Sequence, residues 1–458
     1  MSFPRYPRYK ESGVEWLGEV PEHWTIDRIK RSMASCKNGV WGDDARHDEY
    51  DIPCVRVADF DRQRLRVKLN QPTIRNVTGK ERIGRLLEQG DLLLEKSGGG
   101  DLQPVGCVVI YDDSQPSICS NFIARMQIAA GMNSSFWRYV HAAAYAVRLT
   151  TGSINQTSGI QNLDQDRYFN ERATFPPHSE QSAIAVFLDR ETAKIDALVN
   201  EQQRLIELLK EKRQAVISHA VAKGLNPDAR MKDSGVEWLG EMPAHWEVKA
   251  IRNIANVVRG ASPRPAGDPL YFGGDAIPWV TVAEITKNEA IDLTETETFL
   301  TDEGARHSNR FVKGTVIYSN SGATLGVPKI LRIDACANDG VIAFEGLLPN
   351  VHSQFLYHFL ASITEFIREK VKQGSGQPNL NTDIVKALRF ALPPADEQEL
   401  IVRHIAELTD RFSRLTTEAN TAITLLHERR SALISAAVTG KIDVRGIVPV
   451  QRETVVAA

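Results

Sequence analysis

The residues that could give this chain an active site of its own fall into incomplete motifs. The Pro-Pro segments FPPH (175–178) and LPPA (392–395) lack the Asp or Asn before the prolines and the aromatic residue after them that amino-methyltransferases use to hold a target amine. No complete Gly-x-Gly-x-x-Gly, phosphate-loop or His-Glu-x-x-His motif occurs, and SGGG (97–100) is too short to bind a nucleotide. We therefore expect no catalytic, cofactor or metal site in this chain.

One run of side chains has the chemistry to hold DNA. Residues 62–68 read RQRLRVK and follow a strand-like segment. On a β-strand, alternation would place every second side chain of this run on one face. Those side chains are Arg62, Arg64, Arg66 and Lys68. Such a face would suit a row of phosphates or the major groove. The alternative is a solvated sheet edge whose charges prevent aggregation.

Further candidates lie in turns and loops. Lys96 and Ser97 precede the glycines 98–100, which would let a DNA backbone approach closely, although a simple hairpin turn would use the same residues. The second half has no matching basic run, and the other candidates are amides, hydroxyls and cations that could pair with bases or phosphates. They are Gln161, Arg259, Arg264, Asn320, Ser321, Thr324, Lys372, Gln373, Gln377 and Asn379. Because the loop at 372–379 is repeated in the first half, a positioning role is favoured for it over base readout.

Most of the chain is written twice. SGVEWLGEVPEHW (12–24) has a near copy, SGVEWLGEMPAHW (234–246), and four of the seven tryptophans lie in this phrase. Strand-like and loop segments then recur in the same order, ending with TFPPHSEQ and ALPPADEQ. Because Trp side chains favour burial, we expect the phrase to pack each domain against the helix of the other half. Docking of another subunit is the alternative. Residues that discriminate between DNA sequences should lie where the two copies differ.

Two long helices are expected after the Pro-Pro segments, over about 180–223 and 397–439, closed by Gly224 and Gly440. Apolar residues at three- and four-residue steps form a seam on each. The first seam holds Ile195, Leu198, Leu205, Leu209 and Val216, and the second holds Phe412, Leu415, Ala419, Ala422, Leu426, Leu433 and Ala436. A long helix with one apolar stripe needs a partner, so we expect an antiparallel coiled coil. The predicted fold class is α+β: two similar domains with twisted β-sheet cores, joined and separated by these helices, in a pseudo-two-fold repeat.

The amino-acid composition and the cysteine spacing indicate the broad class of protein. The 458 residues are 42% hydrophobic and 25% charged, with a formal net charge of -3, which is ordinary for a globular protein. Five cysteines form no Cys-x-x-Cys pair, and no run of 18 apolar residues occurs. We therefore expect a cytoplasmic protein with neither a disulfide framework nor a membrane-spanning segment.

The duplicated phrase, GSGQPNL (374–380) ahead of LPPADEQ (392–398), and the helix ends KRQAVISHAVAKG and RRSALISAAVTGK resemble the specificity subunit of type I restriction-modification enzymes. The resemblance covers about residues 9–445. It implies a non-catalytic subunit whose two target-recognition domains each read one half of an asymmetric, bipartite site on double-stranded DNA. Two methyltransferase subunits and two motor-nuclease subunits are the implied partners, and S-adenosylmethionine, ATP and Mg would be bound by them.

The expected boundaries follow from the repeat and the resemblance. They are an N-terminal segment (1–24), a first recognition domain (25–178), a first spacer helix (179–224), a linker with the second phrase (225–246), a second recognition domain (247–395), a second spacer helix (396–443) and a disordered tail (444–458). Two other functions stay open at this point. One is a stand-alone DNA-modifying enzyme, and the other is a coiled-coil interaction protein that does not bind DNA.

Overall fold

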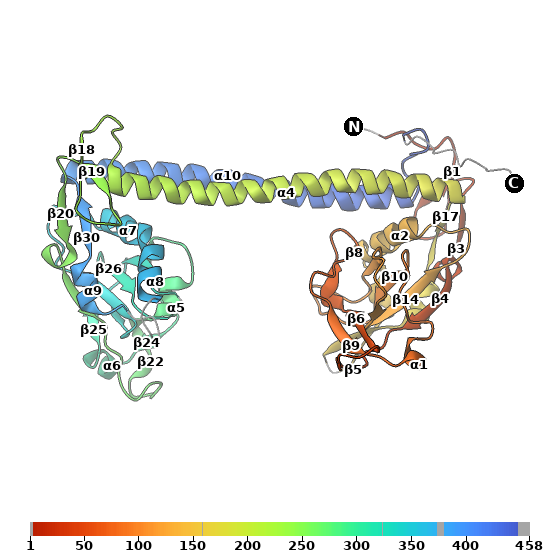
Figure 1. The fold of residues 1–458 in the computed structure, drawn as a ribbon, viewed down its shortest axis with the longest axis horizontal. Coiled ribbons are helices and arrows are strands. Elements are labelled where there is room, and N and C mark those ends of the chain that lie inside the picture. The colour runs from red at the N-terminus through yellow and green to blue at the C-terminus, as the bar shows by residue number, and fades with distance from the viewer. Residues whose placement is uncertain (1–2, 158, 323, 373–379, 448–458) are drawn as a thin grey trace. The chain divides into compact units, whose positions relative to one another are not determined.

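The chain forms two compact units in the computed structural model, which describes residues 3–157, 159–322, 324–372 and 380–447. Unit 1 comprises Met1–Gln203 and Asn420–Ala458, and unit 2 comprises Arg204–Ala419. Each unit holds one α/β domain and part of both long helices, which are α4 (His178–Lys223) and α10 (Ala395–Val438). Figure 1 labels the elements of the chain.

Unit 1 is built around a six-stranded sheet. Its strands, in order across the sheet, are β4 (Met33–Asn38), β14 (Ile123–Ile128), β10 (Leu92–Glu95), β12 (Val108–Ile110), β8 (Arg66–Val67) and β7 (Phe60–Asp61). Alternate side chains face opposite ways. Leu92, Leu94 and Val108 pack with helix α2 (Ser134–Ala146), whereas Leu93 and Val109 pack against a second sheet. That sheet has the order β13 (Ile118–Cys119), β6 (Asp51–Val55), β9 (Thr73–Asn76) and β5 (Asp43–Asp44).

Smaller elements complete unit 1. A three-stranded sheet has the order β11 (Ser97–Gly98), β16 (Ile160–Leu163) and β15 (Ile154–Thr157). Two strand pairs flank the domain, β1 (Tyr9–Glu11) with β2 (Glu19–Pro21) and β3 (Thr25–Arg28) with β17 (Arg172–Phe175). The short helices are α1 (Gly79–Arg82) and α3 (Gln165–Phe169).

Unit 2 repeats this plan. Its main sheet has the order β21 (Asn256–Arg259), β29 (Val341–Glu345), β26 (Val316–Ser319), β27 (Pro328–Leu331) and β23 (Asp292–Leu293). Helix α7 (Ser353–Ser362) packs on one face. The second sheet is β24 (Phe299–Leu300), β22 (Phe272–Val280), β28 (Ala335–Ala337) and β25 (Asn309–Phe311). The strand pairs are β18 (Met231–Asp233) with β19 (Glu241–Pro243) and β20 (Glu247–Ala250) with β30 (Arg389–Leu392), and the short helices are α5 (Val282–Thr286), α6 (Asp302–Arg306), α8 (Thr364–Lys372) and α9 (Thr382–Ala387).

The two domains share backbone hydrogen bonds as well as strand order. In unit 1 the Lys96 amide donates to the Phe122 carbonyl (2.8 Å), and in unit 2 the Asn320 amide donates to the Gly340 carbonyl (2.9 Å). Two further pairs match in the same way: Gly39–Ile123 with Gly260–Val341, and Ser120–Val55 with Asn338–Val280. The predicted internal repeat is confirmed, and these bonds identify which residues occupy equivalent places.

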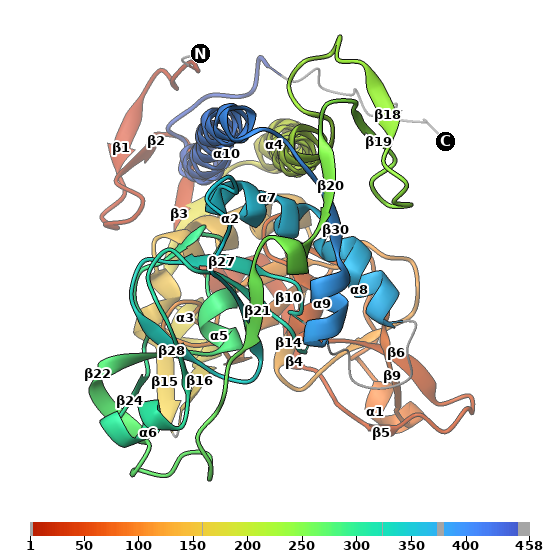
Figure 2. The same ribbon diagram turned by 90° about the vertical axis from the view of Figure 1, so that its left-hand side faces the viewer.

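The two long helices run antiparallel within each unit (Figures 1 and 2). In unit 1, Arg430 of α10 pairs with Asp196 of α4 (2.6 Å), while Arg445, beyond the end of α10, lies 3.9 Å from Glu180 in the first turn of α4. In unit 2, residues near the end of α4 and near the start of α10 share one buried apolar cluster. The predicted α+β class and antiparallel helix pairing are therefore confirmed.

The buried seam of the helices differs in part from the predicted one. Most predicted seam residues are buried or half-buried: Ile195, Leu209, Val216, Phe412, Ala419, Ala422, Leu426, Leu433 and Ala436. Leu198, Leu205 and Leu415 are instead exposed, so their assignment to the seam is wrong. The burial follows a heptad spacing that includes polar residues, among them Thr192 and Arg430, and the three leucines lie one position away from it.

The first and last described segments of the chain contact each other in unit 1. The Asp443 amide donates to the Pro4 carbonyl (2.8 Å), and the Arg445 guanidinium lies over the Tyr6 ring (4.8 Å to its centroid). Val444 is buried in the core of unit 1, so the disordered tail expected from residue 444 onward does not begin there. Residues 448–458 lie outside the described part. Among the described residues, no helix is long and apolar enough to cross a membrane.

Candidate nucleic-acid interface

The repeated phrase joins each domain to the ends of both helices. In unit 1, Trp24 is fully buried and its Nε1–H donates to Glu180 Oε2 (2.9 Å), in the first turn of α4. Tyr6 donates a second hydrogen bond to the same oxygen (3.1 Å). Gly440, just after α10, has a left-handed backbone (φ 75°), and a Cβ there would collide with Pro21. Both facts require glycine at this helix end.

Unit 2 contains the same junction. Trp246 is fully buried and donates to Glu397 Oε2 (2.9 Å), in the first turn of α10. Gly224, after α4, also has a left-handed backbone (φ 74°), and a Cβ there would lie 3.1 Å from the Trp246 ring. The prediction that the phrase packs against the helix of the other half is confirmed. The structure adds a contact that we did not expect, to the first turn of the helix in the same half.

The Glu-Gln pair after each Pro-Pro segment is also structural. Gln181 is buried and accepts a hydrogen bond from the Asn133 amide (3.0 Å), which stands before α2. Gln398 accepts one from the His352 amide (2.8 Å), which stands before α7. The duplicated residues therefore maintain the common framework, and differences in recognition must come from other positions.

The basic run at 62–68 is not the exposed strand that we expected. Within the run, Arg66 and Val67 form β8, and residues 62–65 form the turn between β7 and β8. Leu65 in this turn has a left-handed backbone (φ 56°). The prediction of one alternating basic face is wrong, because most of the run is a turn.

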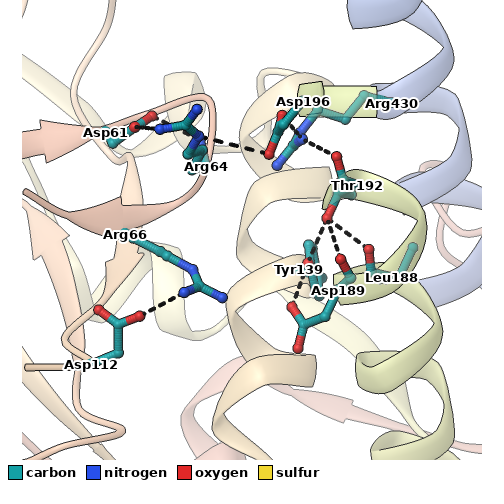
Figure 3. Close-up of polar contacts among 10 residues, drawn as sticks. All are labelled: Asp61, Arg64, Arg66, Asp112, Tyr139, Leu188, Asp189, Thr192, Asp196 and Arg430. Atoms are coloured by element: carbon teal, nitrogen blue, oxygen red, sulfur yellow. Dashed lines mark hydrogen bonds and ion pairs between the residues drawn. The ribbon is translucent and has the colours of Figure 1, made fainter. Parts of the chain in front are cut away.

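Acidic partners neutralise much of this run. Arg62 Nη2 lies 2.7 Å from Oε1 of Glu95, whose carboxylate is buried. Arg66 Nη1 lies 2.9 Å from Asp112 Oδ2, as Figure 3 shows. Lys68 is exposed and forms no ion pair with any described residue. Of the four predicted DNA contacts in the run, Lys68 is the one whose charge is unpaired within this part of the chain.

Arg64 connects the hairpin to the helices of unit 1 (Figure 3). Its guanidinium lies 3.9 Å from Asp196 of α4, and the same carboxylate pairs with Arg430 of α10 (2.6 Å). Arg430 is nearly buried and also donates to the Thr192 carbonyl (3.3 Å). Burial lowers the pKa of the Arg430 guanidinium, and the adjacent Asp196 opposes that shift. This network attaches the domain to its helices.

Lys96 and Ser97 lie at the end of β10 and in β11. Ser97 Oγ donates to Asn162 Oδ1 (2.6 Å). Lys96 is half-exposed, forms no ion pair with a described residue, and has its pKa lowered by partial burial. Gln161 is buried and accepts a weak hydrogen bond from the Val105 amide (3.3 Å), so the structure gives it a role within the domain.

A hollow opens beside Ser97, which we call the unit 1 notch. It has a volume of about 470 Å³ and is lined by Trp41 and residues 56–58, 97–98 and 120–122. Two of the lining aromatic side chains are exposed to solvent, Trp41 by 39% and Phe122 by 46%. The Asn121 side chain is exposed and makes no hydrogen bond to any described residue. The notch thus combines aromatic surface with an unused amide.

The predicted residues of unit 2 gather around Asp339. Arg259 Nε donates to the Asp339 carbonyl (2.6 Å), and Arg264 Nη2 lies 3.6 Å from the Asp339 carboxylate. A hydrogen bond from Ser262 is the main cause that lowers the pKa of this carboxyl group. Asn320 is buried and donates to the Asp339 carbonyl (3.3 Å), which gives its side chain a supporting role.

The other unit 2 candidates are less defined. Ser321 is half-buried and Thr324 is exposed next to residue 323, which is not described. Lys372 ends α8, and its side chain is not described. Gln373, Gln377 and Asn379 lie outside the described residues.

Other polar clusters give no sign of a reactive centre. Among the described residues, no group of three or more His, Cys, Asp or Glu side chains is placed to hold a metal ion. The five cysteines are free thiols, and burial raises the pKa of Cys107 and of Cys119 to about 12.

Comparison with known proteins matches this architecture. A family model described as the type I restriction modification DNA specificity domain matches residues 243–425. The putative type I restriction enzyme MjaX specificity subunit of Methanocaldococcus jannaschii is 20% identical over 95% of this chain and 98% of its own length. This chain is similar to type I specificity subunits over most of its length, and residues 243–425 match the DNA specificity domain of that family.

Other relatives of this chain align over different shares of their length. The MjaIX specificity subunit of M. jannaschii is 28% identical, over 38% of this chain and 40% of its own length. The EcoBI specificity subunit of Escherichia coli is 21% identical, over 94% of this chain and 89% of its own.

Solved structures show the same fold. A chain from a study of complex assembly and conformational transition in the type I R-M system has a TM-score of 0.68 at 14% identity, over 92% of the present chain and 98% of that chain. The HsdS subunit of Thermoanaerobacter tengcongensis has a TM-score of 0.53 at 14% identity, with the same coverage.

Of the notch residues, sequence reasoning singled out Ser97 but missed Trp41, Asn121 and Phe122. Trp41 lies outside the repeated phrases, and Asn121 and Phe122 follow the short strand β13. A signal was available, because the equivalent positions read SNF (120–122) in the first half and NDG (338–340) in the second. The copies differ there although their backbone hydrogen bonds agree.

Proposed function

We propose that this chain is the DNA sequence-specificity subunit of a type I restriction-modification complex, and that each unit reads one half of an asymmetric, bipartite site on double-stranded DNA. The observation that carries the proposal is a duplicated backbone framework with different exposed side chains at equivalent positions. Two identical domains would read the same half-site twice, whereas Asn121 and Asp339 present different chemistry to a base edge.

Catalysis would belong to recruited subunits. In this proposal the long helices recruit two methyltransferase subunits, together with two motor-nuclease subunits, in the cytoplasm. S-adenosylmethionine, ATP and Mg would be bound by those subunits. The helices would also set the separation of the half-sites, since α4, with 46 residues, is about 69 Å long at about 1.5 Å per residue.

Phosphate contacts would come from exposed cations without acidic partners. Lys68 and Lys96 meet this condition among the predicted residues. Arg62, Arg64 and Arg66 are each held by a carboxylate, so their share of phosphate binding should be smaller. In unit 2 this role would fall to Arg259, which is exposed and donates to the backbone carbonyl of Asp339, whereas Arg264 is held by the Asp339 carboxylate.

Methylation-aware sequencing tests the proposal directly. Cells that carry this chain with its methyltransferase subunit should show adenine methylation at one asymmetric motif with a fixed gap. The purified chain alone should bind DNA in a salt-sensitive way and should transfer no methyl group. Methyl transfer by the isolated chain, or a palindromic motif without a gap, would contradict the proposal.

A further inference from the structure

Contacts from Arg75 fix the position of the Trp41 ring in the unit 1 notch. Arg75 lies over the Trp41 ring (4.5 Å to its centroid) and donates to the Trp41 carbonyl (3.1 Å) and the Gly42 carbonyl (2.9 Å). A guanidinium above an aromatic ring attracts it electrostatically. An aromatic side chain fixed in this way loses little freedom on binding, which favours recognition by a preorganised surface.

Lys96 precedes the notch residues Ser97 and Gly98 in the chain. Lys96 adjoins Phe122 through the backbone hydrogen bond of 2.8 Å, and no acidic partner is found for it in the described part of the chain. Arg56 also lines the notch, although Asp59 holds its guanidinium (3.0 Å). An exposed aromatic pair beside a free lysine suits a polyanion that presents flat, partly apolar groups.

The equivalent place in unit 2 has different chemistry on the same backbone. Asp339 replaces Asn121, and Gly340 replaces Phe122. A Cβ at Gly340 would lie 2.8 Å from the Val282 side chain, so a side chain at that position would require Val282 to shift. Instead, Asp339 holds Arg264, whose side chain is 72% exposed. Unit 1 thus presents the Asn121 amide beside the Phe122 ring, and unit 2 presents the Arg264 guanidinium paired with the Asp339 carboxylate.

We propose that Asn121 and Phe122 form a base-reading edge, in which the Asn121 amide pairs with adenine N6 and N7 and the Phe122 ring contacts a thymine methyl beside it. An Asn side chain matches adenine in the major groove, and an aromatic side chain can contact the thymine methyl. By the same chemistry, Arg264 reads a guanine in the other half-site. This inference rests on the proposed function, since it requires that unit 1 binds duplex DNA.

The test is selection of bound sequences from a randomised DNA duplex pool by the full chain. The wild-type chain should enrich a bipartite motif with an A·T pair in one half and a G·C pair in the other. Asn121→Ala should lower discrimination at the A·T pair about 5- to 150-fold and leave the other half of the motif unchanged. Arg264→Ala should relax the guanine in that other half. Asn70→Ala, an exposed asparagine of unit 1 that does not line the notch, is the matched control and should change neither half.

A second measurement addresses the Phe122 ring. Replacing the thymine by deoxyuridine in the selected duplex removes one methyl group. The wild-type chain should bind this duplex more weakly, whereas Phe122→Ala should bind both duplexes equally. Thermal unfolding of each variant checks that the exposed substitutions leave the fold intact.

The outcomes separate the two proposals. If the wild-type chain enriches a bipartite motif that Asn121→Ala and Phe122→Ala leave unchanged, the notch inference is wrong and the proposed function stands. If the wild-type chain enriches no motif, both are overturned. A change in both halves of the motif on Asn121→Ala would also overturn the assignment of this edge to one base pair.

Discussion

Replacement of Asp196 should lower the stability of unit 1 more than the partial exposure of the Asp196 side chain suggests. Its carboxylate joins Arg430 of α10, at 2.6 Å, and Arg64 of the β7–β8 turn, at 3.9 Å. The Arg430 side chain is only 8% exposed, so Asp196→Ala would leave a buried guanidinium with the Thr192 carbonyl as its remaining partner. Removing one partner of a buried ion pair leaves the other charge buried and unpaired, which costs roughly 3–5 kcal/mol.

The expected loss is smaller than that range because water reaches the pair. Asp196 is 24% exposed, and the Arg64 contact is a partly solvated pair that contributes about 0–1 kcal/mol. We therefore expect Asp196→Ala to lower the unfolding free energy of unit 1 by about 2–4 kcal/mol. Arg430→Met removes the buried cation and should cost less, and the double variant should be milder than the sum by about 1–3 kcal/mol.

Hydrogen exchange of unit 1 amides measures this cost, because a two-unit chain does not unfold in one step. The slowest amides of α2 should exchange about 30- to 700-fold faster in Asp196→Ala, at one tenfold change per 1.4 kcal/mol. The α7 amides of unit 2 provide an internal control. Glu22→Ala, which breaks the surface pair with Arg8 (3.6 Å), is the matched control variant. Unchanged exchange in Asp196→Ala, or single-variant losses that simply add, would refute the reasoning.

Three further predictions concern separate features. Burial lowers the pKa of His141 to about 4 from its usual 6.5, so the unfolded chain takes up a proton between these pH values that folded unit 1 does not. The stability of unit 1 should then fall by up to about 3 kcal/mol as pH drops through this window. His141→Gln should remove this pH dependence, measured by hydrogen exchange of the α2 amides, whereas the pH dependence of unit 2 stability should not change. Lys68→Ala should reduce the salt slope of DNA binding by about one and leave the recognition motif unchanged. Arg64→Ala should mainly lower the stability of unit 1. An altered motif for Lys68→Ala in filter-binding selections would show instead that Lys68 reads bases. Trp246→Phe removes the donor to Glu397 and should destabilise unit 2 by about 1–3 kcal/mol, against a smaller loss in unit 1 for Trp16→Phe, whose indole is half-exposed. Equal losses, measured by hydrogen exchange of α7 and of α2 respectively, would contradict the junction assignment.

The framework was predictable from sequence because its residues are duplicated. Trp24 and Trp246 marked the junctions, and Gly224 and Gly440 marked the helix ends. Repetition at matching positions reports common geometry, so the domains, the helices and their antiparallel pairing could be predicted without knowing any contact. Gln161 was instead predicted as a DNA contact, whereas it is buried and accepts a hydrogen bond from the Val105 amide.

Two features depended on contacts that the sequence does not display. The seam of α4 includes Thr192, and a polar residue in a seam hides the true heptad register, so Leu198 and Leu205 were assigned to it wrongly. The basic run at 62–68 has alternating charge, but Leu65 with its left-handed backbone forms part of a turn. Its arginines meet carboxylates that lie far away in sequence, such as Asp196.

Unit 1 is built from two segments that lie far apart in the sequence, and this affects its folding during synthesis. Unit 2 is one continuous stretch, whereas unit 1 needs residues 420–447 to cover the apolar side of α4. On the ribosome, Ile184 and Leu188 therefore emerge long before Ile434 and Val438, against which they pack in the finished core. Uncovered apolar surface on a growing chain invites aggregation. The unit that is translated first is thus the one that must finish folding last.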